Sequence, residues 1–502
     1  MNAPNEPRPL SKSKLVAFRQ CPKRLWLEIH HPELRKDSSA TQATFRTGHE
    51  LGALAQRLYD PAGNGTVIDF HADGIGAAVS RTKEMLRQGN PIFEAGFNAE
   101  GALAFADVML PTFDGDRISW RMVEVKSSTS VKPYQADDVA IQSFVAKASG
   151  VALDSVAIAF INRDWVYLGG GDYRGLLSEQ DLTASAFSRE DEVRVWIKNA
   201  QLIAAQPQPP AVETGTQCES PFSCGFKPHC EGSRAKIEYP VEWLPHMQSK
   251  ALRDYLEESG AQDMREVPDA LLSDKHRMVR DATVSGTEYF DAEGAHQDLS
   301  RYGLPAYFLD FETIQFGVPR WAGTRPFQTL PFQFSLHRLD EQGRLTHQSF
   351  LDTSGSDPSQ AFASSLLEAC SEPLPIFVYN IKFEGSRLRE LAQRFPLMAP
   401  GLNALRGRLV DLLPIAEARY YHPSQQGSWS IKKLLPAIKP ELRYDELTGV
   451  QDGGMAMDAY LKATDPVTGI EQVTDIRNQL VDYCKLDTLA MVEIWRKFSQ
   501  NP

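Results

Sequence analysis

The sequence predicts an α/β protein with two cores, on three observations. Short strand-like segments alternate with helical patterns twice, once in each half of the chain. Each half also holds its own set of acidic residues within or beside those segments. The chain has 502 residues, enough for two or three domains that each bury a core. We therefore expect domains at 1–235 and 301–502, joined by a helical linker at 236–300.

In the first half, apolar residues at helical spacing predict helices between about residues 10 and 60. Apolar runs bounded by turn residues then predict strands, and a helical pattern follows them. The expected strands are 92–93, 102–110, 118–125, 156–161 and 165–168, and the expected helix is 134–148. Residues 204–210 contain three prolines and read as an extended connection.

Residues 240–300 are mostly polar and suggest two short helices joined by a turn at Gly260. They fit a plain helical spacer, or alternatively a helix-hairpin-helix style turn that touches nucleic acid. A second α/β unit is expected from residue 307 onward. Its strands are expected at 307–311, 333–338 and 376–379, and its last helix at 475–498.

The composition limits the cellular location and the binding partners that we expect for this protein. Apolar residues make up 42% of the chain, and no apolar run is long enough to cross a membrane. The N-terminus lacks the apolar segment of a signal peptide, so we expect a cytoplasmic protein without a membrane partner. The formal net charge of −12 requires any nucleic-acid contact to come from local basic stretches. The candidates are Lys12, Lys14, Arg19, Lys23, Arg24, Lys432 and Lys433.

The first acidic set is Asp107 with Glu124 and Lys126. Glu124 and Lys126 are two residues apart on an apolar strand, so both side chains point to the same face. Two carboxylates there can hold Mg²⁺ or Mn²⁺, which polarises a phosphodiester and lowers the pKa of a bound water. Lys126 can orient that water or stabilise charge in the transition state. The alternative is an ordinary Glu-Lys pair on an exposed strand.

This set, followed by a helix with Asp138 and Gln142, resembles the PD-(D/E)XK nucleases of the RecB type. The resemblance implies a restriction-endonuclease-like fold with Asp107, Glu124 and Lys126 as the core, and Gln142 as a supporting amide. Many relatives place a His four residues after a Gly in the first helical region. Here Gly48 is followed directly by His49, so either His49 substitutes or the metal has one protein ligand fewer.

Four of the six cysteines form a pattern around this set. Cys218, Cys224 and Cys230 lie close together in a loop rich in Pro and Gly, and Cys21 lies far upstream. Four thiolates suit tetrahedral Zn²⁺ or an iron–sulfur cluster, with His229 as an alternative ligand; unrelated buried thiols are the remaining possibility. One Cys before and three after the acidic residues resembles the iron–sulfur RecB-like nucleases, which implies a structural [4Fe-4S] cluster.

The second acidic set has three parts. Asp310 and Glu312 are two residues apart on a strand and therefore share a face. Asn380, Phe383 and Glu384 follow another strand, and Tyr483 and Asp487 share one face of the last helix. Carboxylates that converge on one point repel each other unless cations bind, which is the condition for a two-metal site. Tyr483 can position the attacking water through its hydroxyl.

These three parts resemble, in order and spacing, the DnaQ-like exonucleases of the DEDDy type. The resemblance implies a ribonuclease H-like fold, with Asp310, Glu312, Glu384 and Asp487 as metal ligands and Tyr483 as a catalytic residue. Glu384 is a departure, because the family usually has Asp there. Asp411 is a reserve candidate that fits a structural role better, and Cys370 and Cys484 are expected in the core.

Both halves together resemble bacterial predicted RecB-like nucleases fused to a DnaQ-like exonuclease domain. The resemblance implies metal-dependent hydrolysis of DNA, either single-stranded or at ends, in repair, recombination or defence. The DnaQ-like half is expected to run 3′→5′, and the RecB-like half to cut internally or from 5′ ends. An RNA-directed nuclease is one alternative, because this site chemistry does not read the 2′-hydroxyl. A non-catalytic scaffold for DNA ends is the other.

Overall fold

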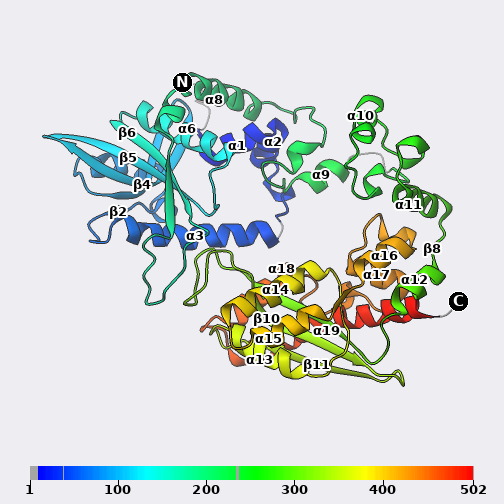
Figure 1. Ribbon diagram of the computed structural model, residues 1–502. Helices are drawn as coiled ribbons and strands as arrows, with labels where there is room; N and C mark the ends of the chain where they lie inside the picture. The colour runs from blue at the N-terminus through cyan, green and yellow to red at the C-terminus, as the bar shows by residue number, and fades with distance from the viewer. Residues whose placement is uncertain (1–8, 38, 233–236, 501–502) are drawn as a thin grey trace. The chain divides into compact units, whose positions relative to one another are not determined.

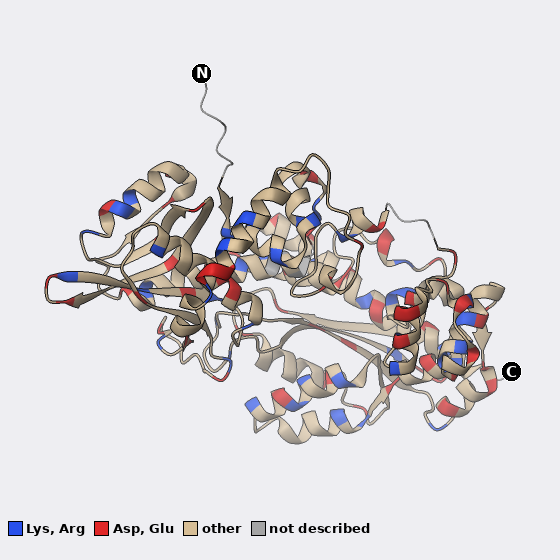
Figure 2. Cartoon of the chain, turned by 90° about the horizontal axis from the view of Figure 1, so that it is seen from above, with Lys and Arg blue, Asp and Glu red and all other residues tan. Residues whose placement is uncertain are grey.

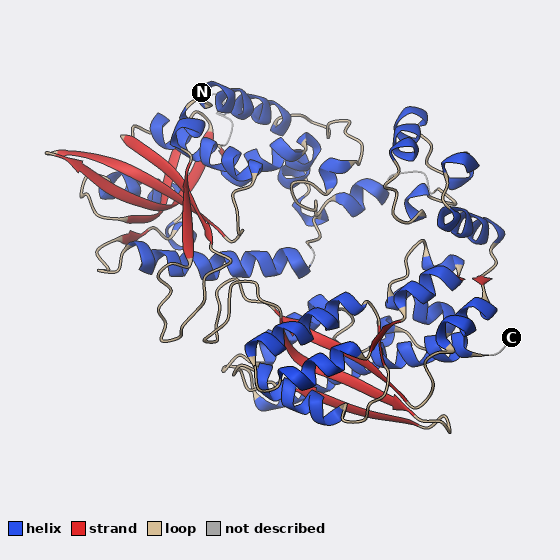
Figure 3. Cartoon of the chain, viewed as in Figure 1, coloured by secondary structure: helices blue, strands red, loops and turns tan. Residues whose placement is uncertain are grey.

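The computed structural model describes residues 9–37, 39–232 and 237–500. The chain divides into two compact units, of which the first comprises residues 1–234 and 316–328. The second comprises residues 235–315 and 329–502. Sheets and helices are combined in both units, as the α/β prediction requires (Figure 3). No helix within the described ranges is both long and apolar enough to cross a membrane.

The first unit is built on a seven-stranded sheet (Figure 1). The strand order is β2-β3-β4-β5-β6-β7, with β1 paired to β4. The pairs β3–β4, β4–β5 and β6–β7 are antiparallel, whereas the pairs β1–β4, β2–β3 and β5–β6 are parallel, and α6 joins β5 to β6. The strands are β1 Leu10–Ser11, β2 Thr66–Val67, β3 Ile92–Ala99, β4 Ala102–Asp114, β5 Arg117–Lys126, β6 Leu153–Ile161 and β7 Leu177–Asp181.

Different helices cover the two faces of this sheet. Met122 and Ile158 share a core with residues of α6, whereas Val125 on the other face packs near Leu51 and Leu54 of α3. Glu124 and Lys126 alternate with Val125, so they face α6. The helices of this unit are α1 Lys12–Gln20, α2 Pro22–His30, α3 Ser39–Tyr59, α4 Phe70–Asp73, α5 Ile75–Met85, α6 Pro133–Ala148, α7 Thr183–Phe187, α8 Glu190–Ala204 and α9 Lys227–Gly232.

The strand expected at 165–168 is wrong. The structure has a loop there, and the strand that pairs with β6 is β7, Leu177–Asp181. Gly169, Gly170 and Gly171 follow the segment with φ between 70° and 94°, a left-handed conformation that ends an extended run. The aromatic rings at 165–168 pack within the loop instead of lying on a sheet: Tyr167 stacks on Tyr173 with the ring centroids 4.7 Å apart.

The second unit contains a five-stranded sheet in the order β11-β10-β9-β12-β13. Strands β11, β10 and β9 are antiparallel, and β9, β12 and β13 are parallel. The strands are β9 Ala306–Ile314, β10 Leu330–Leu339, β11 Leu345–Leu351, β12 Ile376–Val378 and β13 Leu409–Asp411. A separate pair joins β8 Tyr289–Phe290 to β14 Tyr420–Tyr421.

Helices pack on both faces of this sheet. Leu309 and Phe311 share a core with α13, α14 and α15, and Phe308, on the opposite face, clusters with Met491 and Val492 of α19. The helices are α10 Lys250–Ser259, α11 Asp274–Ser285, α12 Ala292–Leu299, α13 Ser359–Ala369, α14 Ile381–Arg394, α15 Ala399–Gly407, α16 Leu413–Arg419, α17 Ile431–Ile438, α18 Gly453–Ala463 and α19 Ile470–Ser499.

Residues 237–300, within the expected linker, pack into the second unit. They form α10, α11 and α12, and Gly260 ends α10 in the left-handed conformation, with φ 67°. Leu252 of α10 and Val279 of α11 are fully buried in the same core as Phe308 and Trp429. Because this segment shares that core, it is an integral part of the second unit and not a detached spacer.

Candidate active sites

Strand β9 carries the first two carboxylates of the second acidic set. Asp310 and Glu312 leave the strand on the same face as Phe308, because alternate residues share a face. Phe308 clusters with residues of α19, so this helix covers that face. Asp487 lies on α19 and is the charged group that acts most strongly on Asp310. The fold therefore brings together residues that are more than 170 positions apart in the chain.

Buried polar contacts hold α19 against the sheet near these carboxylates. Gln333 Nε2 of β10 donates to the Leu480 carbonyl oxygen over 2.8 Å. Ser335 Oγ of β10 lies 2.8 Å from Thr488 Oγ1, and both residues are fully buried. Thr488 directly follows Asp487, so the hydroxyl contact fixes the part of the helix that presents this carboxylate.

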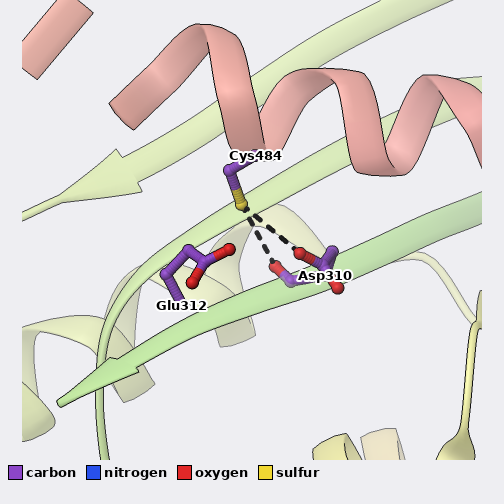
Figure 4. Close-up of side chains that lie close together, drawn as sticks. All are labelled: Asp310, Glu312 and Cys484. Atoms are coloured by element: carbon purple, nitrogen blue, oxygen red, sulfur yellow. Dashed lines mark hydrogen bonds between the residues drawn. The ribbon is translucent and has the colours of Figure 1, made fainter. Parts of the chain in front are cut away.

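Cys484 points from α19 into the acidic site (Figure 4). Its Sγ lies 3.6 Å from Asp310 Oδ2 and within 4.8 Å of a carboxylate oxygen of Glu312. Burial and the neighbouring carboxylates raise the pKa of this thiol well above its usual range, so it remains protonated. In the described part of the chain, Asp310, Glu312 and Cys484 form the one such group of possible metal ligands within 4.8 Å.

The surroundings of this site disfavour the ionised form of its carboxyl groups. Burial raises the pKa of Glu312 to about 8, with a further contribution from Asp487. Burial also raises the pKa of Asp487 to about 6 and that of Asp310 well above its usual value. Such clustered acids ionise fully only when positive charge is supplied. The donor set, which is mainly carboxylate oxygen, fits Mg²⁺ or Mn²⁺.

Glu384 adds a fourth carboxylate at the start of α14. The residue is 2% exposed, and its Oε2 atom is buried without a hydrogen-bond partner. Burial raises its pKa to about 8. The preceding turn is held by Asp411, whose carboxylate oxygens each lie 3.0 Å from one backbone nitrogen, that of Asn380 or Ile381. Asp411 thus shapes the turn, and the unpaired oxygen of Glu384 is available to a cation.

Besides Cys484, which was expected only in the core, two residues of this site were not expected from the sequence as its members. Tyr444 donates its hydroxyl to Asp487 Oδ1 over 2.6 Å, and Tyr483 also hydrogen-bonds Asp487. The Lys432 ammonium lies 5.0 Å from the Tyr483 ring centroid and lowers the pKa values of Glu312 and Asp487 against the effect of burial. Lys432 was a candidate only as a surface contact for nucleic acid, and no motif singles out Tyr444.

The first acidic set lies on β4, β5 and α6. Asp107 Oδ2 accepts the Val125 backbone N–H over 2.7 Å, which holds the two strands together at the site. Glu124 is 2% exposed, and its Oε2 accepts from Gln142 Nε2 over 2.6 Å. Lys126 Nζ lies 2.6 Å from Glu124 Oε1. The structure thus brings the four expected residues to one face of the sheet.

Two further charged residues complete this site. Lys12 Nζ, at the start of α1, lies 2.7 Å from Glu124 Oε1 and 3.4 Å from Asp138 Oδ1. Lys126 also pairs with Asp138. Burial opposes ionisation of Glu124, but the two lysines outweigh it and lower its pKa to about 2. Burial and the charge of Glu124 raise the pKa of Asp107 well above its usual range.

His49 does not supply the missing metal ligand of the first site. His49 is exposed on α3, the helix that packs on the opposite face of the sheet from Glu124. The Oε1 atom of Gln142 is buried without a hydrogen-bond partner, so the site holds one unsatisfied acceptor. Asp107 and Glu124 remain the oxygen donors suited to a divalent cation here.

The four cysteines of the expected cluster line one pocket. Cys21 lies between α1 and α2, and Cys218, Cys224 and Cys230 follow α8. Leu27 and Phe226 also line this pocket, and together with Trp26 they form an apolar cluster with Cys218 and Cys224. Within the described residues, no three of these sulfur atoms lie within 4.8 Å of one another. Four thiols that line one pocket are a donor set that suits Zn²⁺ or an iron–sulfur cluster.

Lys and Arg residues are interspersed with Asp and Glu in both units (Figure 2). Several of the basic candidates near the N-terminus are engaged within the first unit. Arg24 pairs with Glu28 over 2.9 Å, and the Arg19 guanidinium pairs with Asp137 and lies over the Trp196 ring. These two residues therefore have structural partners, and the pairing leaves them less suited to phosphate contacts.

A family model described as a domain of unknown function (DUF2779) matches residues 307–430. The matched segment contains Asp310, Glu312 and Glu384 and ends before Tyr483 and Asp487. No curated protein matches the chain.

Proposed function

We propose that this protein is a metal-dependent nuclease that hydrolyses DNA phosphodiesters. Its second unit would be a DnaQ-like, ribonuclease H-like 3′→5′ exonuclease, and its first a RecB-like PD-(D/E)XK nuclease. One observation carries the proposal: carboxylates from β9 and α19 converge at one buried site, with Glu384 as their neighbour on α14. Burial of several carboxyl groups together is costly and is typical of functional sites.

In the exonuclease site, Asp310, Glu312, Glu384 and Asp487 would hold Mg²⁺ or Mn²⁺. The bound ions would supply a water of lowered pKa and stabilise charge on the leaving oxygen. Tyr483 keeps its proton, because burial and the nearby carboxylates raise its pKa, so its hydroxyl can donate to or orient a water. Lys432, which lies over the Tyr483 ring, would attract the phosphate backbone.

The four cysteines would hold a [4Fe-4S] cluster in a structural role. Cys21 comes before the acidic set of the first unit, and Cys218, Cys224 and Cys230 come after it. A cluster bound by all four would tie the two ends of the unit together. In that unit, Asp107 and Glu124 would bind the metal and Lys126 would stabilise the developing charge, with Gln142 holding Glu124 in place.

A matched pair of variants tests whether the chain has two independent active sites. Asp310→Ala removes a carboxylate from the second site, and Lys126→Ala removes the ammonium from the first. With Mn²⁺ and end-labelled single strands, we expect Asp310→Ala to abolish stepwise 3′ shortening and to retain any other cleavage. Equal loss of every product in both variants would contradict two sites. Uncut DNA but degraded RNA would favour the RNA-directed alternative, and no cleavage of either would favour a scaffold.

A further inference from the structure

Lys12 is placed in the first site by the fold and not by chance. The strand β1, Leu10–Ser11, pairs with β4 in register, with Ser11 opposite Leu103. The Ser11 hydroxyl then accepts the Lys14 backbone N–H over 3.4 Å and starts helix α1. Lys12 lies at the junction of these two anchored elements, so its side chain is delivered to the sheet face that carries Glu124.

Lys12 uses the same carboxylate oxygen that a metal would need. Glu124 Oε1 lies 2.7 Å from Lys12 Nζ and 2.6 Å from Lys126 Nζ, and Glu124 Oε2 accepts from Gln142. Both oxygens of Glu124 are therefore engaged. A divalent ion held between Asp107 and Glu124 would meet the Lys12 ammonium at close range, and two cations in a buried site repel each other strongly.

The ion pairs around Glu124 are balanced without a metal, and Asp107 is the carboxyl group of this site that has no ion pair among the described residues. Glu124 and Asp138 provide two carboxylates, and Lys12 and Lys126 provide two ammonium groups that pair with both of them. The side chain of Lys12 is 20% exposed, whereas that of Glu124 is 2% exposed. Lys12 can therefore move outward on its long flexible stem while the carboxylate stays in place.

We infer that Lys12 is an internal counter-cation that competes with a divalent metal for Glu124 and thereby weakens metal binding at the first site. The inference rests on the proposed metal site at Asp107 and Glu124. It assigns Lys12 a regulatory position rather than a contact with the reacting atoms. The first site then needs more free metal than it would without the Lys12 ammonium.

The test measures Mn²⁺ binding directly, from the electron paramagnetic resonance signal of free Mn²⁺, without nucleic acid. The full chain carries Asp310→Asn and Asp487→Asn, so that the second site no longer binds metal. In this background we compare Lys12→Met with the parent protein. Removing the ammonium is expected to tighten Mn²⁺ binding at least about tenfold. Unchanged or weaker binding in Lys12→Met would overturn the inference.

Matched variants separate competition from a general structural effect. Lys12→Arg keeps the charge, and Lys14→Met removes a lysine that points roughly 200° away around α1, so both should bind Mn²⁺ like the parent. Adding Asp107→Asn to Lys12→Met should abolish the gain; a gain that persists would place the ion elsewhere and overturn the inference. If Lys12→Met fails to fold, Lys12→Gln carries the same expectation, because it keeps a donor for Glu124 without the charge.

This experiment and the nuclease assay can fail separately. Exonuclease activity of the natural chain depends on Asp310 and Asp487, which the binding test removes. A chain that shortens DNA but whose Lys12→Met variant gains no Mn²⁺ affinity would retain the proposed function and lose this inference.

Discussion

Glu384 is the residue at which the second site departs from the exonuclease family that we propose for it. Its carboxylate is buried, its Oε2 atom has no hydrogen-bond partner, and burial raises its pKa to about 8. The longer side chain thus leaves an oxygen free where the family usually has Asp. These features are those of a metal ligand in a site where a bound cation would favour the ionised form of the carboxyl group.

Substitution of Glu384 should distinguish a ligand from a packing residue. Glu384→Gln keeps the size but removes the charge, and it should lower the exonuclease rate by at least about a hundredfold, since even residues behind metal ligands contribute 10- to 100-fold. Glu384→Asp should retain part of the activity. Rates on a 5′-labelled single strand with Mn²⁺ measure both variants. Full activity in Glu384→Gln would exclude Glu384 as a ligand.

The acidic site should also make stability depend on pH. Glu312 and Asp487 have folded-state pKa values of about 8 and about 6, above those of an unfolded chain. Such groups stabilise the fold at low pH, and this contribution is lost as the pH rises through the folded-state values. The metal-free second unit should therefore lose stability as the pH rises from about 4, near the unfolded-state pKa of these carboxyl groups, to about 8.

Thermal unfolding with and without Mn²⁺ measures this effect. We expect the stabilisation by Mn²⁺ to grow as the pH rises over that interval, because the metal binds the ionised carboxylates. Asp310→Asn with Glu312→Gln should flatten the dependence on pH. A pH-independent effect of Mn²⁺ in the natural chain would argue against binding at these carboxylates.

At the scale of elements, the cysteine pocket joins the turn between α1 and α2 to the segment after α8. Cys21 lies at that turn, and Cys218 and Cys224 are buried beside Phe226. Burial raises the pKa of Cys224, so a metal or cluster is needed to hold its thiolate form. The proposed cluster would therefore stabilise the ends of the first unit.

Anaerobically purified protein should be brown, with an absorbance near about 400 nm and iron bound to the chain. Cys21→Ser should remove this absorbance and lower the melting temperature, because it deletes one ligand of a structural site. Cys370→Ser is a matched control in the second unit, since Cys370 is buried away from that pocket. Colourless protein that carries zinc would contradict the cluster.

The sequence predicted the elements with strong apolar patterns and missed those defined by tertiary contacts. Strands β4 and β5 were foreseen because they are apolar runs bounded by turn residues. Strand β7, Leu-Ser-Glu-Gln-Asp, has little apolar character and forms because β6 offers it an edge. Lys12 belongs to the first site and Tyr444 to the second through contacts with residues far away in the sequence. The spacing of neighbouring residues in the sequence cannot reveal such contacts.

At the scale of the molecule, each unit has its own core and its own acidic site. Each unit is a compact α/β unit built around a sheet. The two sites lie in separate units and share no residue. A substitution in one site should therefore leave the activity of the other unchanged, and the effects of two such substitutions on activity should be additive. Residues 237–300 share a core with the five-stranded sheet, so a chain shortened to begin at residue 301 should have a less stable second unit.

The most direct test of the account follows a 5′-labelled single strand with Mn²⁺ in chains that retain only the second site. With Lys126→Ala, we expect a ladder of products shortened from the 3′ end one nucleotide at a time. Adding Asp310→Asn should abolish that ladder while the protein remains folded. A ladder that survives Asp310→Asn, or none with Lys126→Ala alone, would contradict the proposed 3′→5′ exonuclease.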